Sequence, residues 1–213
     1  MDVAKKLLTL YRQLLKHFGH QKWWPTKTKK NKQFEIIIGA ILTQNTAWRN
    51  VEKAIDNLLA ENLIDPKKLA RIKKEKLAKL IRPAGYYNQK AERLILAARF
   101  FMKNKSPTRK QLLAVKGIGP ETADSIMLYA FNRPYFVIDA YTRRILSRLG
   151  LIKGDENYVE LQNFFHKYLP QWQELFKEYH ALLVELAKQF CRKKPICASC
   201  PVKRLCKFCK RFI

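Results

Sequence analysis

Acidic residues are scarce in this sequence. Its 213 residues include 17 Asp and Glu against 43 Lys and Arg, which gives a formal net charge of +26 at pH 7. The excess is spread through a globular pattern and is not confined to a tail, so it favours a polyanionic partner, nucleic acid above all. The same charge also fits the lysine-rich surface of a heat-adapted protein, or a ribosomal or membrane-surface protein.

Long apolar segments are absent. The longest run, Phe34 to Leu42, is interrupted by Glu35 and is far too short to span a membrane. Between Val3 and Phe18 apolar residues recur at helical spacing with lysines between them, which indicates an amphipathic helix of the mature fold and not a signal peptide. We therefore expect no transmembrane segment, no membrane partner and a cytoplasmic, nucleoid-associated location.

Strand patterns are nearly absent as well. Only Tyr135 to Ile138 reads as extended, and turn residues separate the other segments. The pattern predicts an all-α fold of about ten short helices. Helical periodicity covers Phe34 to Leu42, Trp48 to Leu59, Lys67 to Lys73, Lys76 to Ile81, Asn88 to Met102, Arg109 to Val115, Pro120 to Phe131, Ala140 to Leu149, Glu156 to Tyr168 and Gln171 to Phe190.

No cysteine precedes residue 191, which argues against a disulfide framework. All five cysteines follow in one short loop, at positions 191, 197, 200, 206 and 209. Four thiolates so close together favour a compact metal centre. Zinc is one possible occupant, held by the pairs Cys197/Cys200 and Cys206/Cys209, although the pairs are closer together than usual zinc spacing. An iron–sulfur cluster is the other.

Glycine is also sparse, with seven residues, yet two of them stand together in V-K-G-I-G-P-E-T-A-D. A first helix is expected to end at Val115 or Lys116, Gly117 to take a positive φ, and Pro120 to occupy the first position of a second helix. The result is a helix-hairpin-helix whose turn offers backbone N–H groups to a DNA phosphate. A plain glycine turn between two core helices is the competing interpretation.

After the hairpin, the stretch F-V-I-D-A-Y-T-R-R-I places Asp139 behind an apolar run and at the start of another helix. From the residues alone Asp139 is a helix N-cap. Together with the hairpin, however, this stretch resembles the endonuclease III branch of the helix-hairpin-helix DNA glycosylase superfamily, which implies that Asp139 is the catalytic residue. The two roles are compatible.

Three stretches in register, G-A-I-L-T-Q-N-T, R-P-A-G-Y-Y-N-Q-K-A and G-I-G-P-E-T-A-D, look like the endonuclease III-like 3-methyladenine DNA glycosylases. The resemblance implies a two-lobed fold. One lobe is a helical bundle over residues 26–134 that contains the hairpin at about 109–131. The other combines residues 1–25 with 135–213 and carries Asp139 and an iron–sulfur loop at 191–209.

The resemblance also implies site residues. Trp23 and Trp48 would sandwich a flipped base, and Gln44 would fill the gap left in the duplex, whereas each tryptophan taken alone reads as core. The implied base pocket comprises Trp23, Trp24, Pro25, Trp48, Gln44, Asn45 and Glu121. The implied DNA contacts are Lys116, Gly117, Ile118, Gly119, Thr122 and Lys90.

The cofactor implied by the resemblance is a structural 4Fe-4S cluster on Cys191, Cys197, Cys200 and Cys206. This chain has one residue fewer between its first two cysteines than the family pattern, and Cys209 is an extra thiol. Cys209 therefore remains an alternative fourth ligand, and zinc an alternative metal.

Glu121 bears on the reaction. Bifunctional members of the branch carry at this position a lysine that forms a Schiff base with the sugar, and a carboxylate cannot form that imine. Unless Lys116 substitutes, we expect a monomeric, monofunctional glycosylase that hydrolyses an alkylated purine such as 3-methyladenine from damaged double-stranded DNA and leaves an abasic site. The positive charge of such a base suits tryptophan faces. The alternatives are a bifunctional, mismatch or oxidised-pyrimidine glycosylase, and a non-enzymatic iron–sulfur DNA-binding protein.

Overall fold

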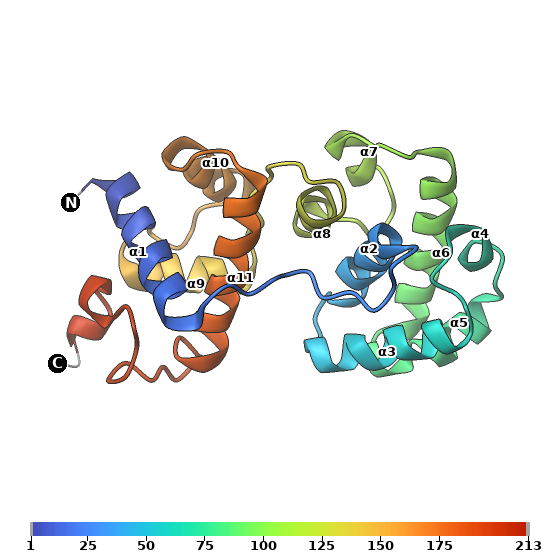
Figure 1. Ribbon diagram of the computed structural model, residues 1–213, viewed down its shortest axis with the longest axis horizontal. Helices are drawn as coiled ribbons and strands as arrows, with labels where there is room; N and C mark the ends of the chain where they lie inside the picture. Colours follow the sequence, from blue (N-terminus) through green and yellow to red (C-terminus); the bar gives the residue numbers. More distant parts are fainter. Residues whose placement is uncertain (1, 212–213) are drawn as a thin grey trace. The chain divides into compact units, whose positions relative to one another are not determined.

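The structure, a computed structural model, describes residues 2–211, and over that range it is built from helices and contains no β-strand (Figure 1). The all-α prediction is confirmed. The α-helices are α1 (Val3–Phe18), α2 (Lys32–Leu42), α3 (Trp48–Ala60), α4 (Pro66–Leu69), α5 (Lys74–Leu80), α6 (Tyr87–Lys103), α7 (Arg109–Leu113), α8 (Pro120–Ser125), α9 (Ala140–Leu149), α10 (Tyr158–Tyr168) and α11 (Gln173–Gln189). Shorter helical turns are η1 (Arg82–Ala84), η2 (Ile126–Ala130), η3 (Lys203–Leu205) and η4 (Cys209–Arg211).

The chain divides into two compact units. The central unit is Trp24–Arg133, and the terminal unit combines Met1–Trp23 with Pro134–Ile213.

The central unit is organised around α2. This helix is buried on all sides, as its sequence KQFEIIIGAIL favours, because apolar residues occupy every face of it. Its one buried carboxylate, Glu35, accepts hydrogen bonds from the backbone amides of Lys27 and Thr28, each at 2.8 Å, and from the Thr28 hydroxyl at 2.7 Å. These bonds compensate for the loss of water around the charge.

Two helices of the central unit are divided or shortened relative to the sequence prediction. The segment predicted as one helix from Pro120 to Phe131 changes at Ile126 from α8 to the wider π-helical η2, whose five residues are all buried. The helix predicted to run from Lys67 ends at Leu69, and Lys73 becomes the N-cap of α5, because the chain turns between them.

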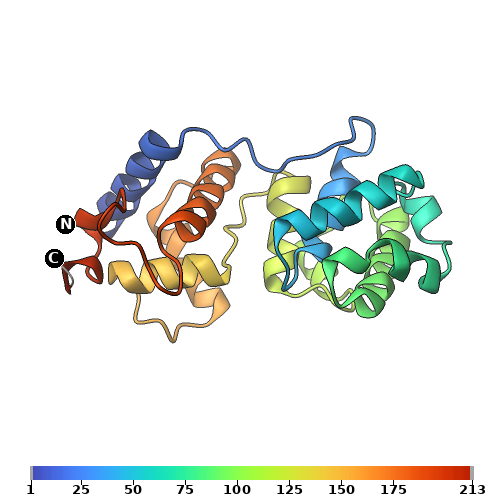
Figure 2. The same ribbon diagram turned by 90° about the horizontal axis from the view of Figure 1, so that it is seen from below.

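In the terminal unit α1 and α11 lie side by side (Figures 1 and 2). The buried Tyr179 of α11 donates its hydroxyl to the Leu7 carbonyl of α1 at 2.8 Å. The extended stretch before α9 forms no strand. Its backbone is bonded by side chains of α10 instead, since His166 Nε2 accepts from the Phe136 amide at 3.1 Å and Gln162 donates to the Phe136 carbonyl at 2.8 Å.

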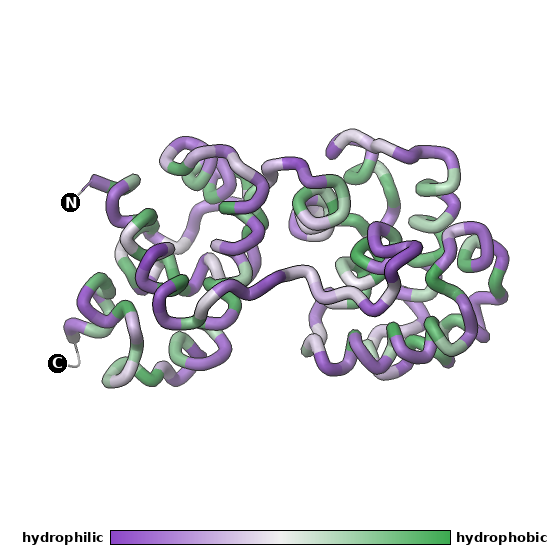
Figure 3. Tube along the Cα trace, in the orientation of Figure 1, coloured by the Kyte–Doolittle hydropathy of each residue, from purple (hydrophilic) through white to green (hydrophobic). Residues whose placement is uncertain are grey.

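Hydrophobic and hydrophilic stretches are interspersed along the coloured part of the tube in Figure 3. Across residues 2–211, no helix has the length and apolar character needed to cross a membrane.

Candidate functional site

Asp139 is the N-cap of α9. One carboxylate oxygen, Oδ1, accepts a hydrogen bond from the Thr142 amide at 2.7 Å, and the other, Oδ2, lies 3.5 Å from His180 Nε2 of α11. The Asp139 side chain is largely buried, with 15 % of its surface exposed.

The charge state of Asp139 follows from these contacts. Burial by itself raises the pKa of this carboxyl, but the His180 and Thr142 contacts outweigh burial, so the pKa lies below its ordinary value. Asp139 is therefore an anion at neutral pH.

The indole of Trp23 packs on the same histidine. Its ring lies edge-on to His180 with centroids 5.8 Å apart, and the Lys188 ammonium is 5.8 Å from the Trp23 ring. The structure thus brings one predicted pocket residue, Trp23, next to the histidine that contacts Asp139.

Trp48 pairs with Trp24. Their rings meet edge to face with centroids 5.4 Å apart, which leaves no room for a base between them. Trp24 also contacts Tyr129 and lies over Gly39, where an added Cβ would come within 3.0 Å of the indole. Trp24 is half-buried and packs inside the central unit on Trp48, Tyr129 and Gly39, so part of its indole serves packing there, and its place in a base pocket stays a prediction.

The hairpin of the central unit is fixed by a buried ion pair. Arg109 of α7 donates from Nε to Asp124 Oδ1 at 2.6 Å and from a terminal nitrogen to Oδ2 at 3.0 Å, and Asp124 of α8 is fully buried. The first helix ends at Leu113, two residues before the predicted Val115. Gly117 has the expected positive φ of 89°.

Half of the predicted DNA contacts are accessible. Lys116 is 78 % exposed, Gly119 is exposed with open space around it, and Gly117 is half-buried. Ile118 is buried and its amide donates to the Val115 carbonyl at 3.0 Å, so it cannot contact a phosphate.

The predicted DNA contacts of the Thr122 and Lys90 side chains are corrected as well, because both side chains are buried. Thr122 is 6 % exposed and its hydroxyl accepts from Gln44, while Lys90 is 1 % exposed with its ammonium bonded to two backbone carbonyls. Sequence could not show this, because a lysine on a helix is normally solvated.

Gln44 is held against the hairpin. Its amide nitrogen donates to the Gly117 carbonyl at 3.1 Å and to Thr122 Oγ1 at 2.9 Å, and its oxygen accepts from Arg93 at 2.5 Å. The neighbouring Asn45 is exposed and has a positive φ of 53°. A non-glycine residue in this region costs energy that the surrounding structure must offset, which is typical of functional loops.

Pro25 and Glu121 are both exposed. Glu121 stands at the second position of α8, and its carbonyl accepts from Ser125 Oγ at 2.8 Å. Helix α8 contains no lysine that could act in place of Glu121.

The cysteine loop docks on α9 of the terminal unit. Arg144 donates to the Cys191 carbonyl at 2.8 Å, and Arg148 donates to Cys191 Sγ at 3.3 Å and to the Arg192 carbonyl at 2.6 Å. The Arg148 guanidinium also lies 4.9 Å from the Phe208 ring. Two arginines of one helix therefore fix both ends of the loop.

One cavity is lined by all five cysteines. Burial, together with the neighbouring Cys197 and Cys206 thiols, raises the pKa of Cys209, and burial raises the pKa of Cys200 to about 11. Five thiols in one cavity fit a soft metal or cluster by their chemistry. Among residues 2–211, however, no three His, Cys, Asp or Glu side chains are arranged as a formed metal site.

Comparison with known proteins identifies the family. The model described as HhH-GPD superfamily base excision DNA repair protein matches residues 38–171. This chain belongs to the HhH-GPD superfamily. The resemblance noted in the sequence is thereby confirmed.

Individual HhH-GPD proteins are similar over nearly the whole chain. A Methanocaldococcus jannaschii protein proposed to be a DNA repair glycosylase is 48% identical over 210 residues, covering 92% of this chain and 94% of its own. Endonuclease III of Thermotoga maritima is 30% identical, with 95% and 92% covered. The crystal structure of the H. pylori 3-methyladenine DNA glycosylase MagIII bound to 1,N6-ethenoadenine is 35% identical with a TM-score of 0.76, and the match covers 89% of this chain and 98% of that one.

The HhH-GPD protein is thus an endonuclease III-like DNA glycosylase of base excision repair. Three residues around its site were not predicted: His180 beside Asp139, Arg93 beside Gln44, and Tyr86. Tyr86 is 66 % exposed with a positive φ of 47° at the N-cap of α6. The sequence signals for Tyr86 were its place after Gly85 in a turn and its position inside the motif R-P-A-G-Y-Y-N-Q-K-A, whereas the contacts of His180 and Arg93 depend on helices distant in sequence.

Proposed function

We propose that this protein is a monofunctional glycosylase that removes alkylated purines of the 3-methyladenine type from double-stranded DNA by hydrolysis. The observation that carries the proposal is the anionic Asp139, held by the Thr142 amide and His180. An alkylated purine is already a cation, so the enzyme needs a stabiliser for the sugar and no acid for the base.

Asp139 supplies that stabilisation. As the glycosidic bond breaks, positive charge develops on the sugar, and a fixed carboxylate beside it lowers the barrier without reorganisation. The same carboxylate can orient the attacking water. His180 fixes Oδ2 and the Thr142 amide fixes Oδ1, so the carboxylate is positioned before substrate arrives.

The substrate class is supported by aromatic residues and by one comparison. Trp23 and Trp48 are half-buried, so each retains indole surface on which a cationic base can stack, at about 0.5–2 kcal/mol per ring. MagIII, 35% identical, was crystallised with 1,N6-ethenoadenine, a modified purine. We propose that Pro25 and Asn45, like these tryptophans, contribute to recognition of the base, and that Lys116 and Gly119 contact the DNA backbone.

Release of free base tests the proposal. Duplex DNA treated with a methylating agent is incubated with the protein, and the released bases are separated by chromatography. Free 3-methyladenine is the expected product. Release of thymine from a G·T mismatch, or of an oxidised pyrimidine, in its place would overturn the substrate class, and binding without release of any base would overturn the enzymatic assignment.

Glu121 predicts that the DNA strand stays intact. Because this side chain cannot form an imine with the sugar, abasic product should accumulate and break only after alkali, and borohydride should trap no covalent complex. An endonuclease III assayed in parallel provides the positive control for both readouts. A nicked product from the wild-type protein at neutral pH would show that another amine, Lys116 first, acts as nucleophile.

For the cysteine loop we propose a 4Fe-4S cluster on Cys191, Cys197, Cys200 and Cys206. When bound, the cluster would cross-link Cys191, just beyond the end of α11, to the rest of the loop and thereby hold the basic residues of the loop in place, a structural role. The purified protein is expected to be brown with about four irons per chain. Cys200→Ser should lose the iron and Cys209→Ser should keep it. Zinc in place of iron, or loss of iron in Cys209→Ser alone, would contradict the assignment.

A further inference from the structure

Lys90 is a lysine in the core of the central unit. It lies in the first turn of α6 with 1 % exposure, and its ammonium donates to the Leu42 carbonyl at 2.9 Å and to the Ala84 carbonyl at 2.8 Å. Burial lowers the pKa of this ammonium to about 8. An apolar side chain would fill the same space without the cost of desolvating a charge, so the two hydrogen bonds are the reason for a lysine here.

The two carbonyls stand where two helical segments end and two separate loops begin. Leu42 ends α2 and Ala84 ends η1. Two residues beyond each carbonyl stands a side chain that solvent reaches, the half-buried Gln44 after the first and the exposed Tyr86 after the second. Each loop also contains a non-glycine residue of positive φ, Asn45 at 53° and Tyr86 at 47°. Such conformations persist only where neighbouring contacts hold them.

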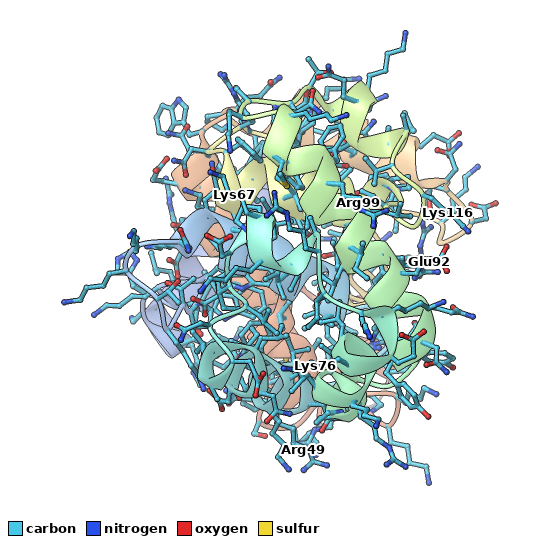
Figure 4. The ribbon with its side chains drawn as sticks, turned by 90° about the vertical axis from the view of Figure 1, so that its right-hand side faces the viewer. Arg49, Lys67, Lys76, Glu92, Arg99 and Lys116 are labelled. Atoms are coloured by element: carbon cyan, nitrogen blue, oxygen red, sulfur yellow. The ribbon has the colours of Figure 1, made fainter. Side chains whose placement is uncertain are left out.

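The adjoining residues of α6 hold the hairpin. Arg93 donates to Gln44 at 2.5 Å and packs on Gly117, where an added Cβ would lie 2.4 Å from the arginine side chain. Glu92 pairs with Lys116 at 2.7 Å, and Figure 4 shows these two side chains next to each other. One edge of α6 therefore contacts three loops that are far apart in sequence.

We propose that Lys90 is a positioning residue that joins loops 43–46 and 84–86 into one preformed surface, so that Gln44 and Tyr86 probe the duplex together. The proposal rests on the proposed function, since it assumes that this surface meets DNA. A surface ordered in advance does not lose conformational entropy on binding, which favours discrimination of a distorted lesion site.

The first experiment needs no DNA. Hydrogen exchange of the full-length protein is measured by mass spectrometry for the wild type and Lys90→Met. The control Lys103→Met removes the same charge from an exposed position in the last turn of α6. Exchange in both loops should accelerate about tenfold in Lys90→Met, because about 1.4 kcal/mol of restraint is lost, and should not change in the control. Unchanged exchange in the two loops would overturn the proposal.

The second experiment measures discrimination. Affinity is compared for a duplex with a tetrahydrofuran abasic-site analogue and for an undamaged duplex. Lys90→Met should lower the ratio of the two affinities about fivefold to tenfold, whereas Lys103→Met should weaken both equally. An unchanged ratio in a variant with loosened loops would overturn the role in DNA probing. A wild-type protein without preference for the analogue would instead overturn the proposed function. Faster loop exchange in Lys90→Met would in that case still support the role of Lys90 in joining the two loops.

If Lys90→Met does not fold, Lys90→Gln replaces it, since the amide keeps a buried donor on a shorter side chain. The same acceleration in both loops and the same lower ratio, each smaller in size, are expected. Wild-type values for both in a folded Lys90→Gln would contradict the proposal.

Discussion

Asp139→Asn should release 3-methyladenine about a hundredfold to a thousandfold more slowly than the wild type, the range found when one fixed electrostatic stabiliser is lost. The substitution keeps an oxygen for the Thr142 amide, so α9 stays capped, and asparagine is as good an N-cap as aspartate. What it removes is the charge. Single-turnover rates on methylated duplex DNA measure the effect, and thermal unfolding checks that the fold is kept.

Asp155→Asn is the matched control, because Asp155 is an exposed aspartate of the same unit. Its rate should equal that of the wild type. Near wild-type base release by Asp139→Asn would contradict the assignment of Asp139.

The lowered pKa of Asp139 also predicts how the wild type and Asp139→Asn differ in their dependence on pH. A carboxylate whose pKa is depressed in the folded state stabilises the fold above its unfolded pKa of about 4, and this stabilisation is lost as pH falls through the folded pKa. The stability difference between wild type and Asp139→Asn should therefore shrink only below about pH 4. The rate of base release by the wild type should likewise fall only at a pH below the one at which an ordinary aspartate becomes protonated.

The sequence predicted those features that depend on local chemistry. The glycine–proline turn predicts the hairpin because few residues besides glycine accept the φ of Gly117, and proline suits the first position of α8. Asp139 was predictable as a cap because capping involves only the next three residues. Each of these signals lies within one turn of helix.

The features that sequence did not predict depend on packing between distant segments. The half-buried Trp24 packs against α2 because Gly39 leaves room for its indole. Lys90 is buried because carbonyls of two other segments meet at its ammonium. His180 approaches Asp139 from a helix 41 residues away in the numbering, and no local pattern marks it.

Arg109→Met should lower the free energy of unfolding by about 3–5 kcal/mol, a large effect for one substitution. Asp124 is fully buried, so without the guanidinium its charge keeps the cost of desolvation and loses two hydrogen bonds, at 2.6 and 3.0 Å. Chemical denaturation measures the loss. Lys110→Met, an exposed lysine of the same helix, controls for the change in net charge and should cost less than about 0.5 kcal/mol.

The double variant Arg109→Met/Asp124→Asn separates the two contributions of this pair. The single variant is expected to be unstable because the buried charge of Asp124 loses its two hydrogen bonds to Arg109. Neutralising that charge should then restore most of the lost stability, since the attraction within a buried ion pair does little more than offset the cost of burying its two charges. The restored protein still lacks the bidentate link between α7 and α8, so its hairpin should bind duplex DNA more weakly than that of the wild type. Full recovery of DNA affinity along with stability would mean that the ion pair only offsets the desolvation cost of its own two charges. The shape of the hairpin would then depend on the Gly117 turn and the Arg93 contact alone.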